Sequence, residues 1–302
     1  MDKEKILKRS KFYYLCSFPV LKKLNEIDMP YAIIKSEPLS MYAYGAYGQR
    51  IFGDIDILLA RQNLKLADGC LKQSGFYQTI NDSKKLREYK IFSLASSHQT
   101  VSYKRLVGKY FIEIDINFDI LWGEYTGKRI DISEFLSDSV EMSIYGCKIK
   151  TLSPLKTMIQ IALHHYKDLN SVFLLATRKN IKYDMFKDVY YLLKNNLDEI
   201  TLDKLYAMSS EYEIIPYVYY VLYYTGLLFK DEILERYVAA FKTPEGEGLL
   251  NCYGLNEAER REWKLDFQTR LESKNLYELI EADLSERDLR NIEINRKVFL
   301  GD

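Results

Sequence analysis

Hydrophobic positions along this chain follow two different rhythms, and the change from one to the other comes near residue 150. Before that point, short apolar runs with the two-residue period of β-strands lie between segments with the helical period. The expected strands are 31–34, 54–59, 88–94, 98–106 and 110–116. One or two short helices are expected within 5–24, and further helices at 39–44 and 61–74. Val107-Gly108-Lys109 has the composition of a hairpin turn between the last two strands. Residues 1–150 are therefore predicted to form a β-rich α+β domain.

From residue 151 onwards the apolar residues recur with the helical period. The expected helices are 154–168, 185–195, 202–210, 217–228 and 231–241. Roughly the last fifty residues are predicted to be helical as well, with a high content of charge. Residues 151–302 are therefore predicted to form a separate, mainly helical domain.

The composition is that of an ordinary folded protein with no dominant charge. Of its 302 residues 47% are hydrophobic and 28% are charged, and 43 Lys and Arg balance 43 Asp and Glu. Zero net charge argues against binding to extended nucleic acid, although a local basic groove stays compatible with it. No apolar segment has the length of a membrane span, and the four cysteines form no C-x-x-C pair. The chain is predicted to be cytoplasmic, with reduced thiols and no membrane partner.

Two aspartates at the start of one predicted strand are the first sign of chemistry. Asp54 and Asp56 point to one side of the strand, whereas Ile55 and Ile57 point to the other. Ionised carboxylates this close repel each other, and a Mg²⁺ ion between them removes the repulsion. Gly53 leaves room for a phosphate to approach. A strand entry with solvated acids has the same local pattern, so the surrounding sequence has to decide between the two interpretations.

The strand predicted at 110–116 also carries acids on one side. Glu113, Asp115 and Asn117 share a face, and isoleucines occupy the other. If this strand lies beside the strand of Asp54, several carboxylates meet at one place, which is destabilising unless a cation faces them. Two-metal transfer of phosphoryl-type groups uses such a set: two carboxylates bridge both metals, and a third ligates the metal that activates the attacking hydroxyl.

With these strands, the chain resembles the nucleotidyltransferase superfamily that includes DNA polymerase beta and the aminoglycoside nucleotidyltransferases. More closely, it resembles the bacterial "uncharacterised nucleotidyltransferase" family within that superfamily. The resemblance covers roughly residues 30 to 200. The segments that carry it are Ile33-Ile34-Lys35-Ser36, Arg50-Ile51-Phe52-Gly53-Asp54-Ile55-Asp56-Ile57-Leu58, Gly75-Phe76, His98, Ile112-Glu113-Ile114-Asp115, Leu163-His164-His165 and Phe186-Lys187-Asp188-Val189-Tyr190-Tyr191-Leu192-Leu193.

The resemblance implies a polymerase beta-like mixed sheet with flanking helices, followed by a helical region on the nucleotide or acceptor side. It also implies a Mg²⁺- or Mn²⁺-dependent enzyme. Such an enzyme transfers an NMP from an NTP to an acceptor hydroxyl and releases pyrophosphate. ATP binding is among the implied properties, and the preferred NTP is not identified by the sequence. The implied catalytic residues and metal ligands are Asp54, Asp56, Glu113 and Asp115. The implied nucleotide contacts are Lys35, Ser36, Arg50, Gly53, His164 and Lys167.

The chain departs from the family's pattern at two places. The family's Lys-Gly is Lys35-Ser36 here, which lowers the freedom of the backbone, and the Ser36 hydroxyl either donates to a phosphate or caps a helix. The family's His after the third acid is Asp115 here, so either Glu113 or Asp115 is the third metal ligand, with Glu113 preferred by its position. Arg50 either clamps a phosphate or pairs with the acids.

Two other functions stay compatible with the sequence. One is a non-catalytic nucleotide-binding or regulatory protein on the same fold, because a fold does not determine an activity. The other is a toxin-like enzyme that modifies tRNA or a protein, with tRNA disfavoured by the zero net charge. The acceptor itself, whether a small molecule, a peptide or protein, or RNA, is not identified by any motif.

Overall fold

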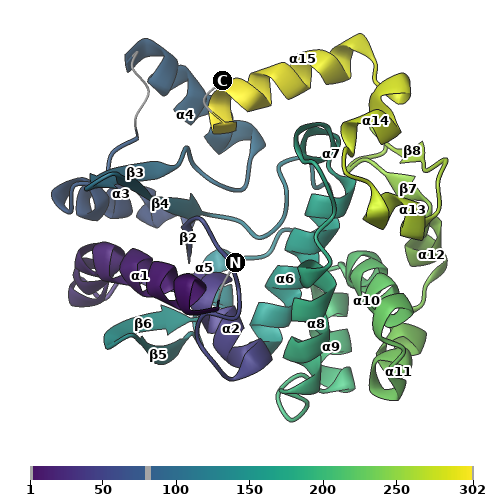
Figure 1. The fold of residues 1–302 in the computed structure, drawn as a ribbon, viewed down its shortest axis with the longest axis horizontal. Helices are drawn as coiled ribbons and strands as arrows, with labels where there is room; N and C mark the ends of the chain where they lie inside the picture. Colours follow the sequence, from purple (N-terminus) through teal and green to yellow (C-terminus); the bar gives the residue numbers. More distant parts are fainter. Residues whose placement is uncertain (1–2, 79–82, 301–302) are drawn as a thin grey trace. The chain divides into compact units, whose positions relative to one another are not determined.

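The computed structural model describes residues 3–78 and 83–300, which form two compact units. The first unit comprises Met1–Gly123 and Ile130–Thr157, and the second comprises Glu124–Arg129 and Met158–Asp302. Figure 1 labels most of the helices and strands of both units. Among the residues that the structure describes, none of the helices combines the length and the apolar character needed to cross a membrane.

A six-stranded sheet with the order β3-β4-β2-β1-β6-β5 organises the first unit. Its strands are β1 (Tyr31–Ile34), β2 (Ile55–Leu59), β3 (Tyr103–Val107), β4 (Tyr110–Asn117), β5 (Val140–Ile144) and β6 (Cys147–Thr151). The pairs β2–β4 and β1–β6 are parallel, and the other neighbouring pairs are antiparallel. The predicted α+β fold with a mixed sheet is confirmed.

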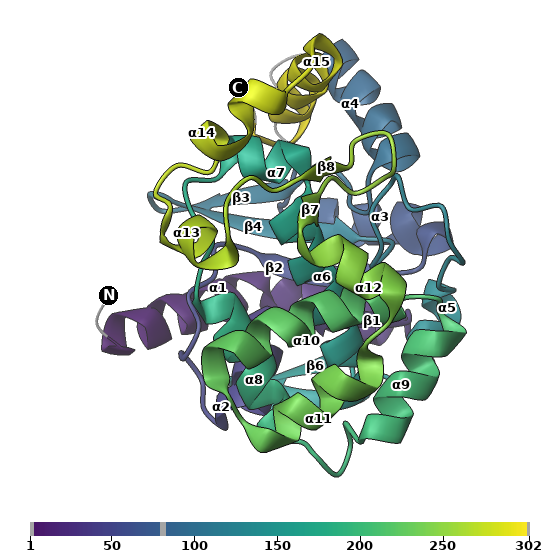
Figure 2. The same ribbon diagram turned by 90° about the vertical axis from the view of Figure 1, so that its right-hand side faces the viewer.

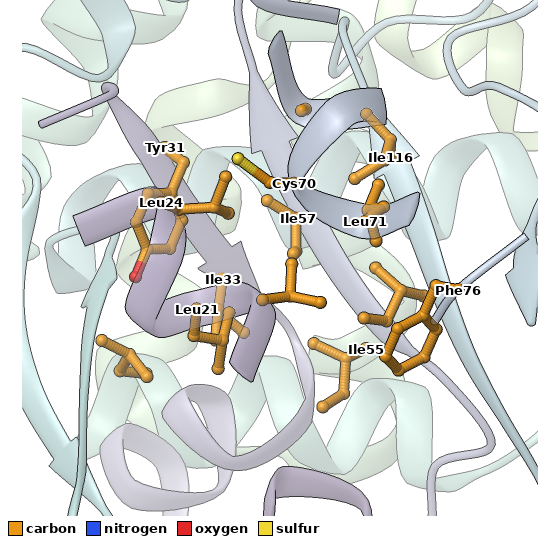
Figure 3. Close-up of a cluster of buried hydrophobic side chains, with 14 of the residues drawn as sticks. Leu21, Leu24, Tyr31, Ile33, Ile55, Ile57, Cys70, Leu71, Phe76 and Ile116 are labelled. Atoms are coloured by element: carbon orange, nitrogen blue, oxygen red, sulfur yellow. The ribbon is translucent and has the colours of Figure 1, made fainter. Parts of the chain in front are cut away.

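Two helices of the first unit, α1 and α3, cover one face of this sheet (Figure 1). The helical elements of the first unit are α1 (Lys3–Glu26), α2 (Ser36–Tyr44), the 3-10 turn η1 (Arg61–Asn63), α3 (Leu64–Gln73), α4 (Ser83–Ser96) and α5 (Ile132–Phe135). Figure 3 shows Ile55 and Ile57 of β2 packed with Leu21 of α1 and Leu71 of α3. Each fully buried side chain of this kind stabilises the fold by roughly 1.5–3 kcal/mol. Burial of these isoleucines leaves the opposite face of β2 for the aspartates.

Three features of the first unit differ from the sequence-based expectation. The strand predicted at 88–94 is wrong, because α4 occupies this segment and its inward positions Leu86, Tyr89 and Ser93 follow the helical period. The strand predicted at 98–106 begins only at Tyr103. The hairpin β5–β6 was not predicted, although Val140–Ile144 alternates between inward and exposed positions.

The second unit is mainly helical. Its helical elements are most of α6 (Pro154–Asn170), α7 (Val172–Thr177), α8 (Asp184–Lys194), α9 (Leu202–Glu211), α10 (Ile215–Phe229), α11 (Glu232–Phe241), α12 (Pro244–Leu250), α13 (Phe267–Glu272), α14 (Tyr277–Ile280), η2 (Glu281–Asp283), α15 (Glu286–Asn295) and η3 (Arg296–Leu300). A small hairpin pairs β7 (Cys252–Tyr253) with β8 (Arg261–Glu262). The apolar helix α10 packs against α8, α9, α11 and α12 (Figure 2). The helices predicted from residue 154 to residue 241 are confirmed.

A buried carboxylate anchors the loop that leads from α2 to β2. Glu37 is fully buried, and both of its carboxylate oxygens accept from the backbone N–H of Gly48 at 3.1 Å. The hydroxyls of Ser10 and Tyr145 also donate to Glu37. Gly48 has φ +67°, and a Cβ at this position would lie 3.0 Å from the Cα of Leu7. Only glycine fits this point, because both the backbone conformation and the close approach of α1 exclude a side chain.

This close approach predicts opposite outcomes for two glycine substitutions. Gly48→Ala should lower the free energy of unfolding by about 1–3 kcal/mol, since the new methyl group is both in a strained conformation and too close to α1. Gly69→Ala in α3 should raise it by about 0.5–1 kcal/mol, because a Cβ there meets nothing within 4 Å. Urea denaturation of both variants measures the difference, and equal effects would contradict the packing of Gly48 on α1.

Candidate functional site

The pairing of the central strands brings the predicted acids to one place on the sheet. In the parallel pair β2–β4, Asp56 lies directly opposite Asp115. Asp54 precedes Asp56 by two residues and Glu113 precedes Asp115 by two, so all four carboxylates belong to the face opposite the isoleucine core. In the antiparallel pair β1–β2, Ile34 lies opposite Asp56, which delivers the next residue, Lys35, to the acids.

Lys35 and Asn117 hold the central aspartate. The Nζ of Lys35 lies 2.9 Å from Oδ1 of Asp56, and the Lys35 side chain is only 17% exposed. The side-chain amide of Asn117 donates to the same oxygen at 3.1 Å. Two donors therefore converge on one carboxylate oxygen of Asp56.

The two neighbouring aspartates lack comparable partners. Burial and the negative charges of Asp56 and Asp115 raise the pKa of Asp54 to about 7. Burial and the charge of Asp56 raise the pKa of Asp115 to about 6, although the Ser102 hydroxyl donates to it. Among the described residues, Oδ1 of Asp115 is buried with no hydrogen-bond partner. One lysine therefore faces three buried or half-buried aspartates, a deficit of positive charge.

Glu113 has a different environment from Asp115. It pairs across the β3–β4 hairpin with Lys104, whose Nζ lies 3.0 Å from its carboxylate, and both side chains are about one-third exposed. Asp115 is 9% exposed and lies beside Asp56. Glu113, which the sequence favoured as the third acid, is thus more solvated than Asp115, and it already has a lysine as partner.

The backbone after β1 is held in an uncommon conformation. Lys35 and Ser36 have φ values of +59° and +32°, in the region that favours glycine. Ser36 is the first residue of α2, and its buried hydroxyl is 2.8 Å from the hydroxyl of Tyr14. A guanidinium nitrogen of Arg50 lies 3.5 Å from the carbonyl oxygen of Ser36, and a Cβ at Gly53 would meet nothing within 4 Å. Two basic residues therefore flank the start of α2 close to open space.

His164 and Lys167 lie on α6 in the second unit. Nε2 of His164 is 3.3 Å from Oδ2 of Asp168, and a guanidinium nitrogen of Arg178 is 2.6 Å from the same oxygen. His164, His165 and Asp168 place their ligand-type atoms within 4.8 Å of one another. Arg178 and Lys167 nevertheless lower the pKa of Asp168, so this carboxylate already has positive charge beside it. The charge deficit that characterises the aspartates of the sheet is absent from this described cluster.

Residues 18–230 match the family described as "Uncharacterised nucleotidyltransferase". The chain belongs to this nucleotidyltransferase family. It is accordingly a transferase of the class that moves a nucleoside monophosphate from an NTP to an acceptor, and enzymes of this class generally use divalent metals. No curated protein matches the chain.

Two solved structures are distantly similar to this nucleotidyltransferase. One is ANT(2")-Ia in complex with adenylyl-2"-tobramycin, at 11% identity and TM-score 0.35, covering 64% of this chain and 95% of that chain. The other is an antigenic nucleotidyltransferase-like protein from Paracoccidioides brasiliensis, at 12% identity and TM-score 0.38, covering 76% of this chain and 92% of that chain.

Some residues around the nucleotidyltransferase's acids were not predicted from the sequence. Ser102 lies in the segment before β3 and donates to Asp115, and no local pattern marks it. The Tyr14 hydroxyl on α1 contacts Ser36 across a long stretch of chain. Asn117 was visible as a same-face neighbour of Asp115, but its bond to Asp56 depends on the pairing of β2 with β4.

The charge deficit predicts that two isosteric substitutions change stability in opposite directions. Without divalent metal at pH 8, Asp115→Asn should raise the free energy of unfolding by about 1–2 kcal/mol, because it removes an uncompensated buried charge. Asp56→Asn should lower it by about 1–3 kcal/mol, because it leaves the half-buried ammonium of Lys35 without its carboxylate. Thermal or urea unfolding in EDTA measures both. A loss of stability in Asp115→Asn would contradict the deficit.

The ion pair of α6 predicts a dependence of stability on pH. Since the folded-state pKa of Asp168 is below its ordinary value of 3.8, the pair contributes fully above about pH 4 and loses its contribution as pH falls further. Arg178→Gln should cost about 1 kcal/mol at pH 7, a small amount because Arg178 is 40% exposed. The cost should shrink below pH 4 in urea titrations. Lys179→Gln, at the exposed neighbouring position, is the matched control, and an equal loss in it would refute the assignment.

Proposed function

We propose that this chain is a Mg²⁺-dependent nucleotidyltransferase that transfers an NMP from an NTP to a hydroxyl of its acceptor and releases pyrophosphate. The observation that carries the proposal is the convergence of Asp54, Asp56 and Asp115 on one face of the sheet, with Lys35 in contact with Asp56. A structural strand has no need of such a set. Hard divalent cations, in contrast, take carboxylate oxygens as their ligands.

The residues present fit a divalent metal centre. Asp115 offers a buried carboxylate oxygen that lacks a partner among the described residues, and Asp54 and Asp115 both resist ionisation without additional positive charge. Asp54, Asp56 and Asp115 would hold the metal. When bound, it neutralises the charge that develops on the transferred phosphoryl group and lowers the pKa of the attacking hydroxyl.

Asp115 is the third carboxylate in this proposal, in place of Glu113. Its neighbour across the strand pair is Asp56, whereas Glu113 pairs with the partly exposed Lys104. In the reaction, the acceptor oxygen forms a bond to the α-phosphorus as the bond from that phosphorus to the bridging oxygen of pyrophosphate breaks. The proton of the acceptor hydroxyl passes to a base of the site, a role that we assign to Asp115.

The triphosphate would lie at the start of α2. Lys35 and Arg50 supply positive charge there, and the first N–H groups of a helix favour an anion. Gly53 keeps the approach to Asp54 open. The Ser36 hydroxyl already contacts Tyr14, so its backbone is the better candidate for a phosphate contact. We assign residues 1–150 to catalysis and 151–302 to the nucleotide or acceptor side, where His164 and Lys167 stay predicted contacts.

An incorporation assay tests the proposed function. Purified protein is incubated with each α-³²P-labelled NTP and Mg²⁺ or Mn²⁺, with and without cell lysate as the source of acceptor. Asp54→Asn, Asp56→Asn and Asp115→Asn should each reduce label transfer by about 10²-fold or more, because each removes charge that the transition state needs. Glu113→Gln should have a much smaller effect.

Asp28→Asn serves as the matched control, since Asp28 is an exposed acid of the same unit. Full activity in Asp54→Asn or Asp56→Asn would refute the metal site. A loss in Glu113→Gln as large as in Asp115→Asn would instead reassign the third acid. Absence of transfer together with absence of Mn²⁺-dependent nucleotide binding would support a non-catalytic protein. The labelled product identifies the base and the acceptor.

A further inference from the structure

Lys35 occupies an unusual position for a phosphate-binding residue. Its ammonium lies on Asp56, not in the open space beside α2, at 2.9 Å from Oδ1. The side chain reaches this position from a backbone with φ +59° and ψ −134°, and Ser36 follows with φ +32°. Side chains at positive φ are strained, and such strain persists only where surrounding structure imposes it. The fold therefore holds the ammonium against the acids.

The same oxygen cannot serve both Lys35 and a metal. Oδ1 of Asp56 already accepts from the Lys35 ammonium and the Asn117 amide, which uses both of its lone pairs. A divalent cation on that oxygen would also be repelled by an ammonium at hydrogen-bond distance. Ligation through Oδ1 therefore requires that Lys35 leaves.

We propose that Lys35 is an exchangeable counter-ion of the metal centre. In the metal-free protein it neutralises Asp56, and on joint binding of metal and NTP it moves to the triphosphate. The inference rests on the proposed function and deepens it. Metal and nucleotide bind cooperatively, because the metal replaces the Lys35 ammonium at Asp56 and the triphosphate becomes the new partner of that ammonium. Metal alone displaces the Lys35 ammonium from Asp56. Metal together with a triphosphate gives the ammonium a new anion at the start of α2, beside Arg50.

This exchange makes the binding of metal alone weaker than the carboxylates would otherwise allow. Removal of the ammonium should therefore tighten the binding of free metal and weaken the binding of the metal–nucleotide complex. Loss of a residue with a purely structural role would weaken the binding of free metal and of the metal–nucleotide complex alike. The opposite signs distinguish an exchangeable counter-ion from a structural ion pair.

The first test is a binding titration of the full chain. Mn²⁺ affinity is measured by electron paramagnetic resonance, alone and with α,β-methylene ATP, which cannot transfer its nucleotidyl group. Lys35→Met should tighten Mn²⁺ alone by about tenfold and weaken Mn²⁺–α,β-methylene ATP by about tenfold relative to wild type. Lys150→Met, which removes a lysine paired with the exposed Asp28, should change neither. Unchanged or weaker binding of Mn²⁺ alone by folded Lys35→Met would overturn the proposal.

A second measurement uses the wild-type protein and does not depend on the stability of a variant. Lysine acetylation followed by mass spectrometry should find Lys35 protected without metal, more reactive with Mn²⁺ alone, and protected again with Mn²⁺ and α,β-methylene ATP. Reactivity that Mn²⁺ alone does not change, at a concentration that saturates the protein, would overturn the exchange. Wild-type protein that binds no Mn²⁺ with or without nucleotide would overturn the proposed function as well. Binding in wild type without the predicted change at Lys35 overturns the counter-ion alone.

Discussion

The parallel pairing of β2 with β4 is the constraint on which the acidic site depends. It places Asp56 opposite Asp115, and the two-residue period of both strands then brings Asp54 and Glu113 to the same face. A slip of one residue in this register would turn the acids into the core and the isoleucines out of it. Burial of Ile55, Ile57 and their neighbours under α1 and α3 therefore fixes the geometry of the carboxylates on the other side (Figure 3).

The acidic cluster on the sheet destabilises the fold in a way that an ordinary structural ion-pair cluster does not. Lys35 contacts one of the three aspartates there, Asp56, and the other two have raised pKa values. On α6 the relation is reversed: Arg178 and Lys167 face Asp168, and the pKa of this carboxylate is lowered. Both clusters combine buried acids with basic residues, but further positive charge would stabilise only the cluster on the sheet. This contrast separates a candidate metal centre from an ion-pair network whose carboxylate already has positive charge beside it.

Local strain lies in the same region as the charge deficit. Lys35 and Ser36 both take positive φ values where glycine would be relaxed. The loop from α2 to β2 is held independently by Glu37, which is fully buried and accepts from Gly48, Ser10 and Tyr145. This second anchor keeps the approach to Asp54 in place without contributing to the acidic face. The rigidity of the loop and the charge of the site therefore have separate origins.

Periodicity predicted much of the fold, and it failed where two periods fit the same residues. The strands β1, β2 and β4 and the helices α1 and α10 follow clear patterns, and the structure confirms them. The segment 88–94 was misassigned because its apolar residues fit a short strand as well as a helix. The choice between the two depends on tertiary packing, which a local pattern does not describe. The β5–β6 hairpin was not predicted, although its first strand alternates between inward and exposed positions.

For the site, the sequence by itself determined which side chains share a face of a strand, because that depends only on the period of two. It also determined the family, through motifs spread from β1 to α8. Only the tertiary structure decided that Asp115 faces Asp56 while Glu113 faces Lys104, and that Lys35 contacts Asp56. The physical reason is that strand partners and register are set by burial of residues far apart in the chain. A local pattern carries the spacing of the acids but does not specify the strand that will lie beside them.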